Sequence, residues 1–139
     1  MILTRLIYYS LNLKQNTPDD ISRILESARR NNRSRDITGV LLFNHNYFVQ
    51  SLEGRRDRIT QTFTRIAEDS RHKGVVLAGM QDTPERNFPD WSMKYISDIS
   101  QNRMLQLQYS TDDRFDPTIM TYAQLSGLLG ALSDLNSAK

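Results

Sequence analysis

Residues 37–53 have the sequence ITGVLLFNHNYFVQSLE, in which two largely apolar runs flank a short polar segment. The runs Ile37–Phe43 and Tyr47–Glu53 are rich in β-branched and aromatic residues, which favour strands. The segment Asn44-His45-Asn46 between them is typical of a tight turn. This stretch therefore predicts a β-hairpin, and the neighbouring segments are interpreted outward from it.

Three further strands are predicted around the hairpin. Leu3–Ser10 alternates, with Thr4, Leu6 and Tyr8 on one side and the residues between them on the other. Val75–Met80 and the shorter run Trp91–Ile96 have the composition of strands and follow the hairpin in the chain.

Two amphipathic helices lie between these strands. The first begins at Thr17-Pro18-Asp19-Asp20, where Thr17 caps the helix, Pro18 suits the first turn and two acidic residues complement the dipole. It is expected to end near Asn31-Asn32. The second helix follows Gly54. The apolar stripes are expected to be Ile21, Ile24, Leu25 and Ala28 in the first helix, and Ile59, Phe63, Ile66 and Ala67 in the second.

The predicted order is β-α-β-β-α-β-β, an α+β fold of the ferredoxin-like kind. Two helices would cover one face of a mixed five-stranded sheet. Two short helices are expected to follow, one from Ser100 with Met104, Leu105 and Leu107, and one capped by Thr121 after a turn at Asp116-Pro117. The second helix carries an apolar face of Leu125, Leu128, Leu129, Leu132 and Leu135. We expect residues 1–97 to form the main domain and residues 98–139 a helical tail. The tail helices are too short to be stable alone, so they must dock on the free face of the sheet or on another protein.

Composition limits the classes of function. The 139 residues are 38% hydrophobic and 24% charged, which is neither a disordered nor a membrane composition. A net charge of +2 gives little support to nucleic-acid binding by itself, because proteins that bind nucleic acids usually show a clustered basic patch. The absence of cysteine excludes disulfides and thiolate chemistry and suits the cytoplasm. Arg5 interrupts the first apolar run, so it is no signal peptide, and no apolar stretch reaches the length of a membrane span.

Two polar residues in predicted strands are not explained by packing alone. Gln50 shares its side of a strand with Phe48 and Leu52, where an amide needs hydrogen-bond partners. Tyr8 lies in the first strand, which folds of this kind usually place beside the third, so that a cross-strand pair with Gln50 is plausible. The simpler readings are a glutamine bonded to backbone or facing water, and a core tyrosine with a satisfied hydroxyl.

The amides of Asn31 and Asn32 form a second candidate feature at the end of the first helix. One interpretation is that they bind the carbonyl and imide edge of a ring. The alternative is C-capping, because asparagine tolerates the left-handed conformation. The surrounding basic run Arg29–Arg35 is best interpreted as a solvated helix end whose cations complement the dipole.

Taken together, these residues resemble the BLUF family of flavin-binding blue-light sensors. The likeness covers about residues 1–97 and continues weakly into the tail. Two departures are Asp36, where the family often has glycine, and a second tyrosine at Tyr9, which should face away from the flavin. The matching segments are Arg5–Tyr8, Asn31-Asn32, Ile37–Gly39, Phe48–Gly54, Arg65-Ile66 with Asp69, Arg71 and His72, Phe88–Met93, and Leu107–Ser110.

The resemblance implies FAD bound non-covalently between the two helices. Asn32 would bond the C4 carbonyl and N3 edge of the ring, and Asn31 and Arg65 its polar edge. Ile24 and Ile66 would enclose the ring faces. Gln50 would bridge Tyr8 and the flavin N5. Further contacts are expected from Ser10 and, toward the ribityl-phosphate tail, from Asp69 and His72.

The resemblance also implies a photoreceptor without substrate turnover, and not an enzyme. Light would drive electron and proton transfer from Tyr8 through Gln50, which would end rotated or tautomerised. Trp91 and Met93 in the fifth strand would pass the change to the tail, although a core aromatic and a gap-filling methionine are the plainer readings. Expected partners are further copies of the chain, as a dimer or larger ring, and a response-regulator-like protein.

Two other functions remain open at this point. One is a small enzyme on the same fold, such as a phosphohydrolase, for which Leu11-Asn12-Leu13 is a poor phosphate loop. The other is a cofactor-free interaction module that uses the basic helix end. A colourless protein that cannot be reconstituted with FAD would favour either of them.

Overall fold

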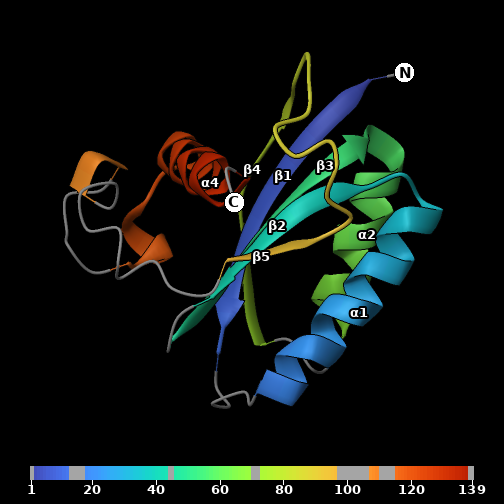
Figure 1. The fold of residues 1–139 in the computed structure, drawn as a ribbon, viewed down its shortest axis with the longest axis horizontal. Coiled ribbons are helices and arrows are strands. Elements are labelled where there is room, and N and C mark those ends of the chain that lie inside the picture. Colours follow the sequence, from blue (N-terminus) through green and yellow to red (C-terminus); the bar gives the residue numbers. More distant parts are fainter. Residues whose placement is uncertain are drawn as a thin grey trace.

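The computed structural model describes residues 2–12, 18–43, 46–69, 73–96, 107–109 and 115–137. Figure 1 shows a single sheet flanked by helices. In chain order the elements are β1 (Leu3–Leu11), α1 (Pro18–Ser34), β2 (Thr38–Phe43), β3 (Tyr47–Arg55), α2 (Arg56–Glu68), β4 (Lys73–Asp82), β5 (Lys94–Ile96), the 3-10 turn η2 (Pro117–Ile119) and α4 (Tyr122–Ser137).

The five strands form one sheet in the order β4-β1-β3-β2-β5. All neighbours are antiparallel except β2 and β5, which are parallel. The ferredoxin-like mixed sheet predicted from the sequence is therefore confirmed. Since β1 and β3 are direct neighbours, side chains far apart in the sequence meet across the centre of the sheet.

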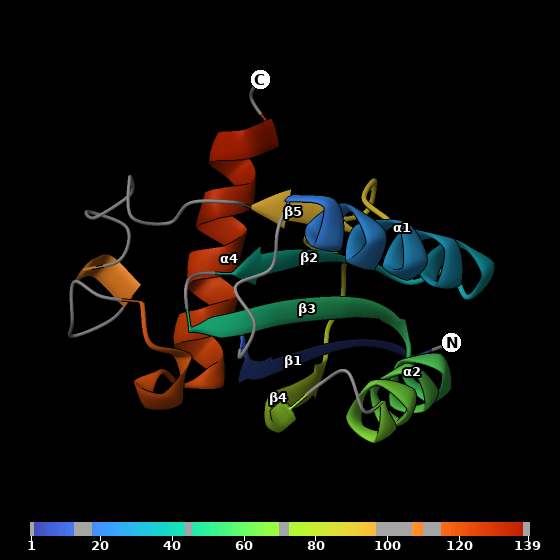
Figure 2. The same cartoon turned by 90° about the horizontal axis from the view of Figure 1, so that it is seen from below.

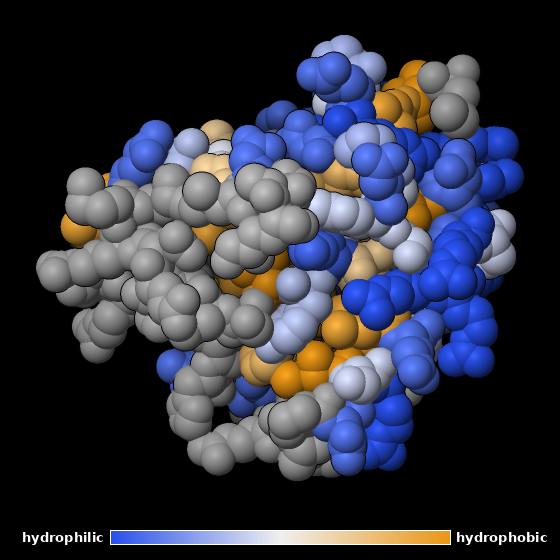
Figure 3. Space-filling view, viewed as in Figure 1, coloured by the Kyte–Doolittle hydropathy of each residue, from blue (hydrophilic) through white to orange (hydrophobic). Residues whose placement is uncertain are grey.

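Helices cover both faces of the sheet. Figure 2 shows α1 and α2 on one face and α4 on the other. The α1/α2 face is built on the predicted stripes, with Ile21, Leu25 and Ile59 buried against Leu6 of β1. In α2, however, Ala67 is exposed and Thr62 is buried, so the inner face is turned slightly from the predicted one. The outward side of α1 and α2, at the right of Figure 3, is largely hydrophilic, as expected for amphipathic helices.

The tail helix α4 completes the second core. It runs over 16 residues from Tyr122 to Ser137 and begins directly after the predicted cap. Thr121 caps it as expected: its Oγ1 accepts from the Gln124 backbone N–H at 3.1 Å, and Gln124 Oε1 accepts from the Thr121 backbone N–H at 2.8 Å. Leu125, Leu128, Leu129 and Leu132 pack on the sheet, so of the two docking places expected for this helix, the free face of the sheet is the one observed. The predicted helix at Ser100, Met104 and Leu105 lies outside the described residues, and Leu107 begins a helical turn at 107–109.

The end of α1 differs from the prediction. The helix continues to Ser34, and Asn31 and Asn32 lie in its last turns. The residue in the left-handed conformation is Asp36, with φ 54°, and Asn32 instead accepts the Ile37 N–H at its backbone oxygen, 2.9 Å away. The interpretation of the asparagines as a left-handed cap is therefore wrong. The position of Asp36 explains why glycine is favoured there.

Glycine is required in β2 at Gly39. A Cβ at this position would lie far inside contact distance of the Ser51 carbonyl oxygen on β3. The two strands of the hairpin predicted at residues 37–53 therefore approach closely at Gly39, and β2 and β3 pair over the whole length of β2. Among the described residues, no helix is long and apolar enough to span a bilayer.

Candidate functional site

Tyr8 and Gln50 are direct cross-strand partners on β1 and β3. The Tyr8 hydroxyl donates a hydrogen bond to Gln50 Oε1. Both side chains are buried, with exposed fractions of 3% and 7%. Burial raises the pKa of Tyr8 above its ordinary value, so the phenol keeps its proton. The sequence-based expectation that these two residues pair is confirmed.

The other end of the Gln50 amide contacts Met93. Gln50 Nε2 lies 3.5 Å from Met93 Sδ, a weak acceptor. Met93 is 2% exposed and belongs to the core beneath α1 and α2. Gln50 is thus held between a strong donor and a soft acceptor, so that a rotation of its amide would change both contacts.

Trp91 lies on the other side of the sheet. It stacks on Phe88 with ring centroids 6.0 Å apart and packs against the α4 core. Trp91 precedes β5, which begins only at Lys94, so the predicted strand Trp91–Ile96 is too long at its start. The Trp91 carbonyl instead accepts from the Gly39 N–H at 2.9 Å, which sets the entry into the strand. Met93, and not Trp91, is therefore the residue at Gln50.

Helix α1 holds the segment that carries Met93. Asn32 is 3% exposed, and its Nδ2 donates to the Ser92 carbonyl at 2.7 Å. One turn earlier, Arg29 Nε donates to the Met93 carbonyl at 2.9 Å. The predicted site residue Asn32 is therefore in contact with the Met93 segment. The role of Arg29 was not predicted, because a basic residue at a helix end carries no sign of a distant carbonyl partner.

Apolar side chains of both helices surround the Tyr8–Gln50 pair. Ile24 of α1 and Ile66 of α2 are partly buried and pack on the same core as Tyr8. The ring of Phe63 lies 5.6 Å from that of Tyr8. Ser10, two residues along β1 from Tyr8, is buried, and its Oγ has no hydrogen-bond partner among the described residues.

The remaining predicted contacts lie at the margin of this group. Asn31 and Arg65 are exposed at the ends of α1 and α2. Asp69 is half-buried directly after α2, where its N–H donates to the Ile66 carbonyl at 3.2 Å. His72 lies outside the described residues. The structure thus brings together the central residues Tyr8, Gln50, Asn32 and Met93. The polar side chains of Asn31 and Arg65 remain at the surface.

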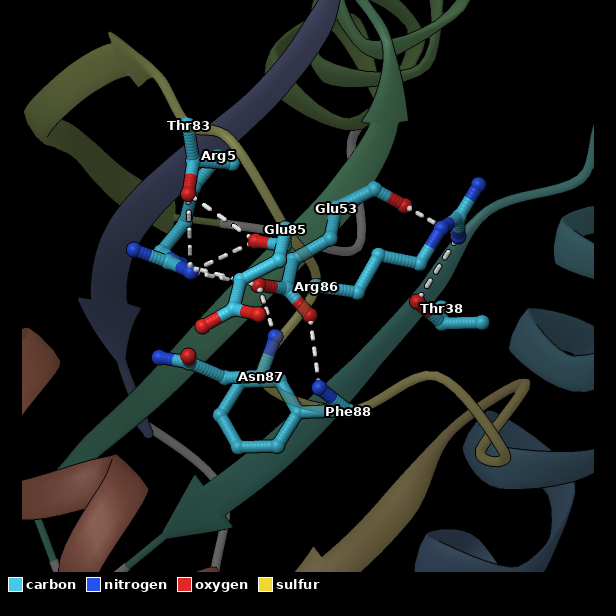
Figure 4. A network of polar contacts seen from close by, with 8 residues as sticks. All are labelled: Arg5, Thr38, Glu53, Thr83, Glu85, Arg86, Asn87 and Phe88. Atoms are coloured by element: carbon cyan, nitrogen blue, oxygen red, sulfur yellow. Dashed lines mark hydrogen bonds and ion pairs between the residues drawn. The ribbon is translucent and has the colours of Figure 1, made fainter.

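Sequence reasoning assigned no role to Glu53, although it is the only charged residue in the run Tyr47–Glu53. Its side chain is fully buried and pairs with Arg5 of β1 at 2.8 Å. Figure 4 shows that its carboxylate also receives backbone N–H groups of the loop before β5. A lone acidic residue at the end of an apolar strand was the available signal.

Comparison with known proteins identifies the class to which this fold and site belong. The family described as sensors of blue-light using FAD, BLUF, matches residues 3–94. Photoactivated adenylate cyclase subunit beta of Euglena gracilis is 37% identical over 92 residues, which is 66% of this chain and 11% of that protein. The blue light- and temperature-regulated antirepressor BluF of Escherichia coli is 35% identical over 88 residues, 63% of this chain and 22% of that protein.

Solved structures agree over nearly the whole chain. The photo-activated state of BlsA superposes with a TM-score of 0.83 at 30% identity and covers 94% of both chains. The dark state of the BLUF protein BlrB gives a TM-score of 0.79 at 29% identity and covers 97% of both. The chain spans only about a tenth of the curated cyclases it matches, so their activity is a property of those proteins.

The chain belongs to the BLUF family of blue-light photosensors, whose cofactor is FAD. The residues present fit a flat ring bound beside the Tyr8–Gln50 pair. Ile24 and Ile66 come from two helices on one core, and Ser10 offers a buried hydroxyl that lacks a partner among the described residues. Thin apolar walls with a few polar groups are the usual design of such sites. The family match favours this class over the small enzyme and the cofactor-free module.

Proposed function

We propose that this chain is a blue-light receptor in which Tyr8 and Gln50 are the photoactive pair. The buried hydrogen bond from the Tyr8 hydroxyl to Gln50 Oε1 is the observation that supports this function. When bound, FAD supplies a ring that absorbs blue light and becomes a strong oxidant. Tyr8 then serves as the electron and proton donor, and the proton leaves its Oη for Gln50 Oε1.

The light-induced state is proposed to differ from the dark state in the orientation or tautomer of the Gln50 amide. In the structure its Oε1 accepts from Tyr8 and its Nε2 faces Met93 Sδ, and we assign this arrangement to the dark state. Rotation of the amide would exchange its two ends and so change both contacts, and tautomerisation would make Gln50 Oε1 a donor; in either case Tyr8 regains both its electron and its proton, and no substrate is turned over. The contact with Met93 is the weaker of the two, because a thioether sulfur is a weak acceptor.

The cofactor is proposed to lie between α1 and α2. Asn32, Asn31 and Arg65 would bond the polar edge of the ring, and Ile24 and Ile66 would enclose its faces. Ser10 would supply the hydroxyl described above. Asp69 and His72 would lie toward the phosphate end. The burial of Asn32 and the partial burial of both isoleucines support this arrangement.

Output is proposed to pass from Met93 and Trp91 to the tail. Trp91 packs against the core to which α4 contributes, so a shift of the Trp91–Met93 segment would change how α4 packs on the sheet. We take residues 1–97 as the flavin domain and 98–139 as the output tail. The relatives include light-regulated cyclases and an antirepressor. For this chain we propose a response-regulator-like protein as the receiver of the signal.

Self-association, as a dimer or a larger ring, is proposed to use β4. This edge strand of ten residues exposes Val76, Leu77 and Met80 at 42%, 46% and 37%. Long apolar edges favour pairing with another chain. Analytical ultracentrifugation should show an oligomer that Leu77→Lys weakens. A monomeric parent protein would remove this part of the proposal.

An absorption spectrum tests the photoreceptor function. The purified protein should be yellow with FAD, and blue light should shift its flavin band to the red, followed by recovery in the dark. Tyr8→Phe should bind FAD but show no shift, because the donor hydroxyl is missing. Tyr9→Phe is the matched control: Tyr9 packs on the α4 side, so the shift should remain. A normal shift in Tyr8→Phe would refute the assignment.

A further inference from the structure

Glu53 is a buried charge on the side of β3 away from Gln50. Side chains alternate along a strand, so two residues three apart face opposite sides of the sheet. The Glu53 side chain has no exposed surface. A carboxylate in such a place is unfavourable unless it is paired and fully hydrogen-bonded. The groups that pair with the Glu53 carboxylate therefore identify the segments whose positions it fixes.

The partners of Glu53 belong to β1 and to the loop before β5. Arg5 donates from Nε at 2.9 Å to Oε2, and its NH2 group lies 2.8 Å from the same oxygen. The backbone N–H groups of Asn87 and Phe88 donate to Oε2 and Oε1, each at 2.8 Å. Figure 4 shows both loop amides pointing at the carboxylate. We refer to Arg5, Glu53 and these two amides as the clamp.

The clamp fixes one end of the segment 87–93. Phe88 is 2% exposed, and its carbonyl accepts from the Trp91 N–H at 3.4 Å in a turn. At the other end, the Met93 carbonyl is held by Arg29, and Met93 Sδ meets the Gln50 amide. The short segment is thus attached at both ends, so Met93 has little freedom to follow Gln50 when that amide turns.

We propose that Glu53 is a positioning residue of the photocycle, which through the clamp keeps Met93 against the dark orientation of the Gln50 amide. This inference rests on the proposed function of Gln50. A segment held at both ends shifts around a rearranged amide only by straining these contacts, so the light-induced arrangement is strained and returns quickly. Loosening the clamp should relieve that strain and prolong the signalling state.

The clamp also borders the output helix. The Tyr122 hydroxyl at the start of α4 is buried, and its pKa is raised by that burial, while the nearby Arg5 guanidinium acts to lower it. The Tyr122 ring packs closely on Gly79 of β4, where a Cβ would approach it to 2.6 Å. Arg5 thus pairs with Glu53 of the clamp and also lies near Tyr122 of α4, so a shift in the clamp would change the surroundings of α4 as well.

The test compares dark recovery in the full chain with FAD bound. Glu53→Gln keeps one acceptor but loses the ion pair with Arg5 and places an amide NH2 near a loop N–H. We expect the rate of dark recovery of Glu53→Gln to be lower than that of the parent protein by at least about threefold, which corresponds to losing part of the free energy of one hydrogen bond. Amide hydrogen exchange at Asn87 and Phe88 should become faster in the dark. Glu53→Asp, which keeps the charge but cannot reach both amides, should change both readouts in the same direction and serves if Glu53→Gln does not fold.

Val49→Ala is the matched control. Val49 lies on β3 on the same face as Glu53 and has no exposed surface, so its truncation lowers stability without touching the clamp. Its recovery rate should equal that of the parent protein. Recovery in folded Glu53 variants at the parent rate or faster, or equal slowing in Val49→Ala, overturns the inference. A parent protein without a light-induced shift would instead count against the proposed function, and amide exchange would still test the clamp.

Discussion

The Tyr8–Gln50 hydrogen bond allows a quantitative test of the pairing, because its two partners are removed from water. In Tyr8→Phe the ring still packs near Phe63, but Gln50 Oε1 loses its donor. In Gln50→Leu the Tyr8 hydroxyl loses its acceptor. A buried polar group left unpaired costs about 1–3 kcal/mol, so each single variant should be destabilised by that amount.

The double variant Tyr8→Phe/Gln50→Leu leaves neither group unpaired. Its loss of unfolding free energy should be smaller than the sum of the single losses by about 1–2 kcal/mol. Urea unfolding of protein stripped of FAD measures all four species, with equal denaturant slopes as the check on comparability. Tyr9→Phe combined with Gln50→Leu serves as the control and should be additive, because Tyr9 packs on the opposite core.

Additivity of Tyr8→Phe and Gln50→Leu within about 0.5 kcal/mol would refute the reasoning. It would mean that the Tyr8 hydroxyl and the Gln50 amide contribute independently to the unfolding free energy in solution. In that case the photoactive role of the pair would lose its structural basis, whatever the spectra of the single variants.

Three other predictions follow from the backbone and from burial. Gly39→Ala should lower the unfolding free energy by about 3 kcal/mol or more, since its Cβ would meet the Ser51 carbonyl, and a loss below 1 kcal/mol in urea unfolding would contradict the tight β2–β3 contact. Asp36→Gly should raise stability by about 1 kcal/mol because φ is 54° there, whereas Asp36→Ala should not; equal melting temperatures for the two variants would argue against strain. Because burial raises the pKa of Tyr8, the light-induced shift should have the same amplitude at pH 7 and pH 10, and stability should fall as the pH rises past about 10, where only the unfolded chain releases the proton; a shift that titrates away near pH 10 would show that the phenol is not buried.

Most of the fold could be predicted because its signals are local. Alternation in Leu3–Ser10 placed Leu6 and Tyr8 on the face that α1 and α2 cover. The stripe Leu125–Leu132 identified a helix that docks on the other face. Boundaries were less accurate: α1 runs on to Ser34, and β5 begins only at Lys94, because these ends depend on hydrogen bonds from other segments.

The candidate site was predicted in part. The pairing of Tyr8 with Gln50 follows from strand alternation and from the usual order of strands in such a fold. Which residue of the fifth strand meets Gln50 could not be read from the sequence, because Trp91 and Met93 both stand near a turn. The contacts of Arg29 and Glu53 with loop carbonyls and amides also have no sequence signature.

Sequence by itself determined the periodicities, and with them the strands, the helices and the sides on which Tyr8 and Gln50 lie. Tertiary structure alone decided that Met93 contacts Gln50, that Trp91 turns toward α4, and that Glu53 is buried against two loop amides. The physical reason is that alternation is a property of each strand, whereas the contacts of Gln50 with Met93 and of Glu53 with the loop amides join residues 34 to 43 positions apart and depend on how the loop before β5 closes over the sheet.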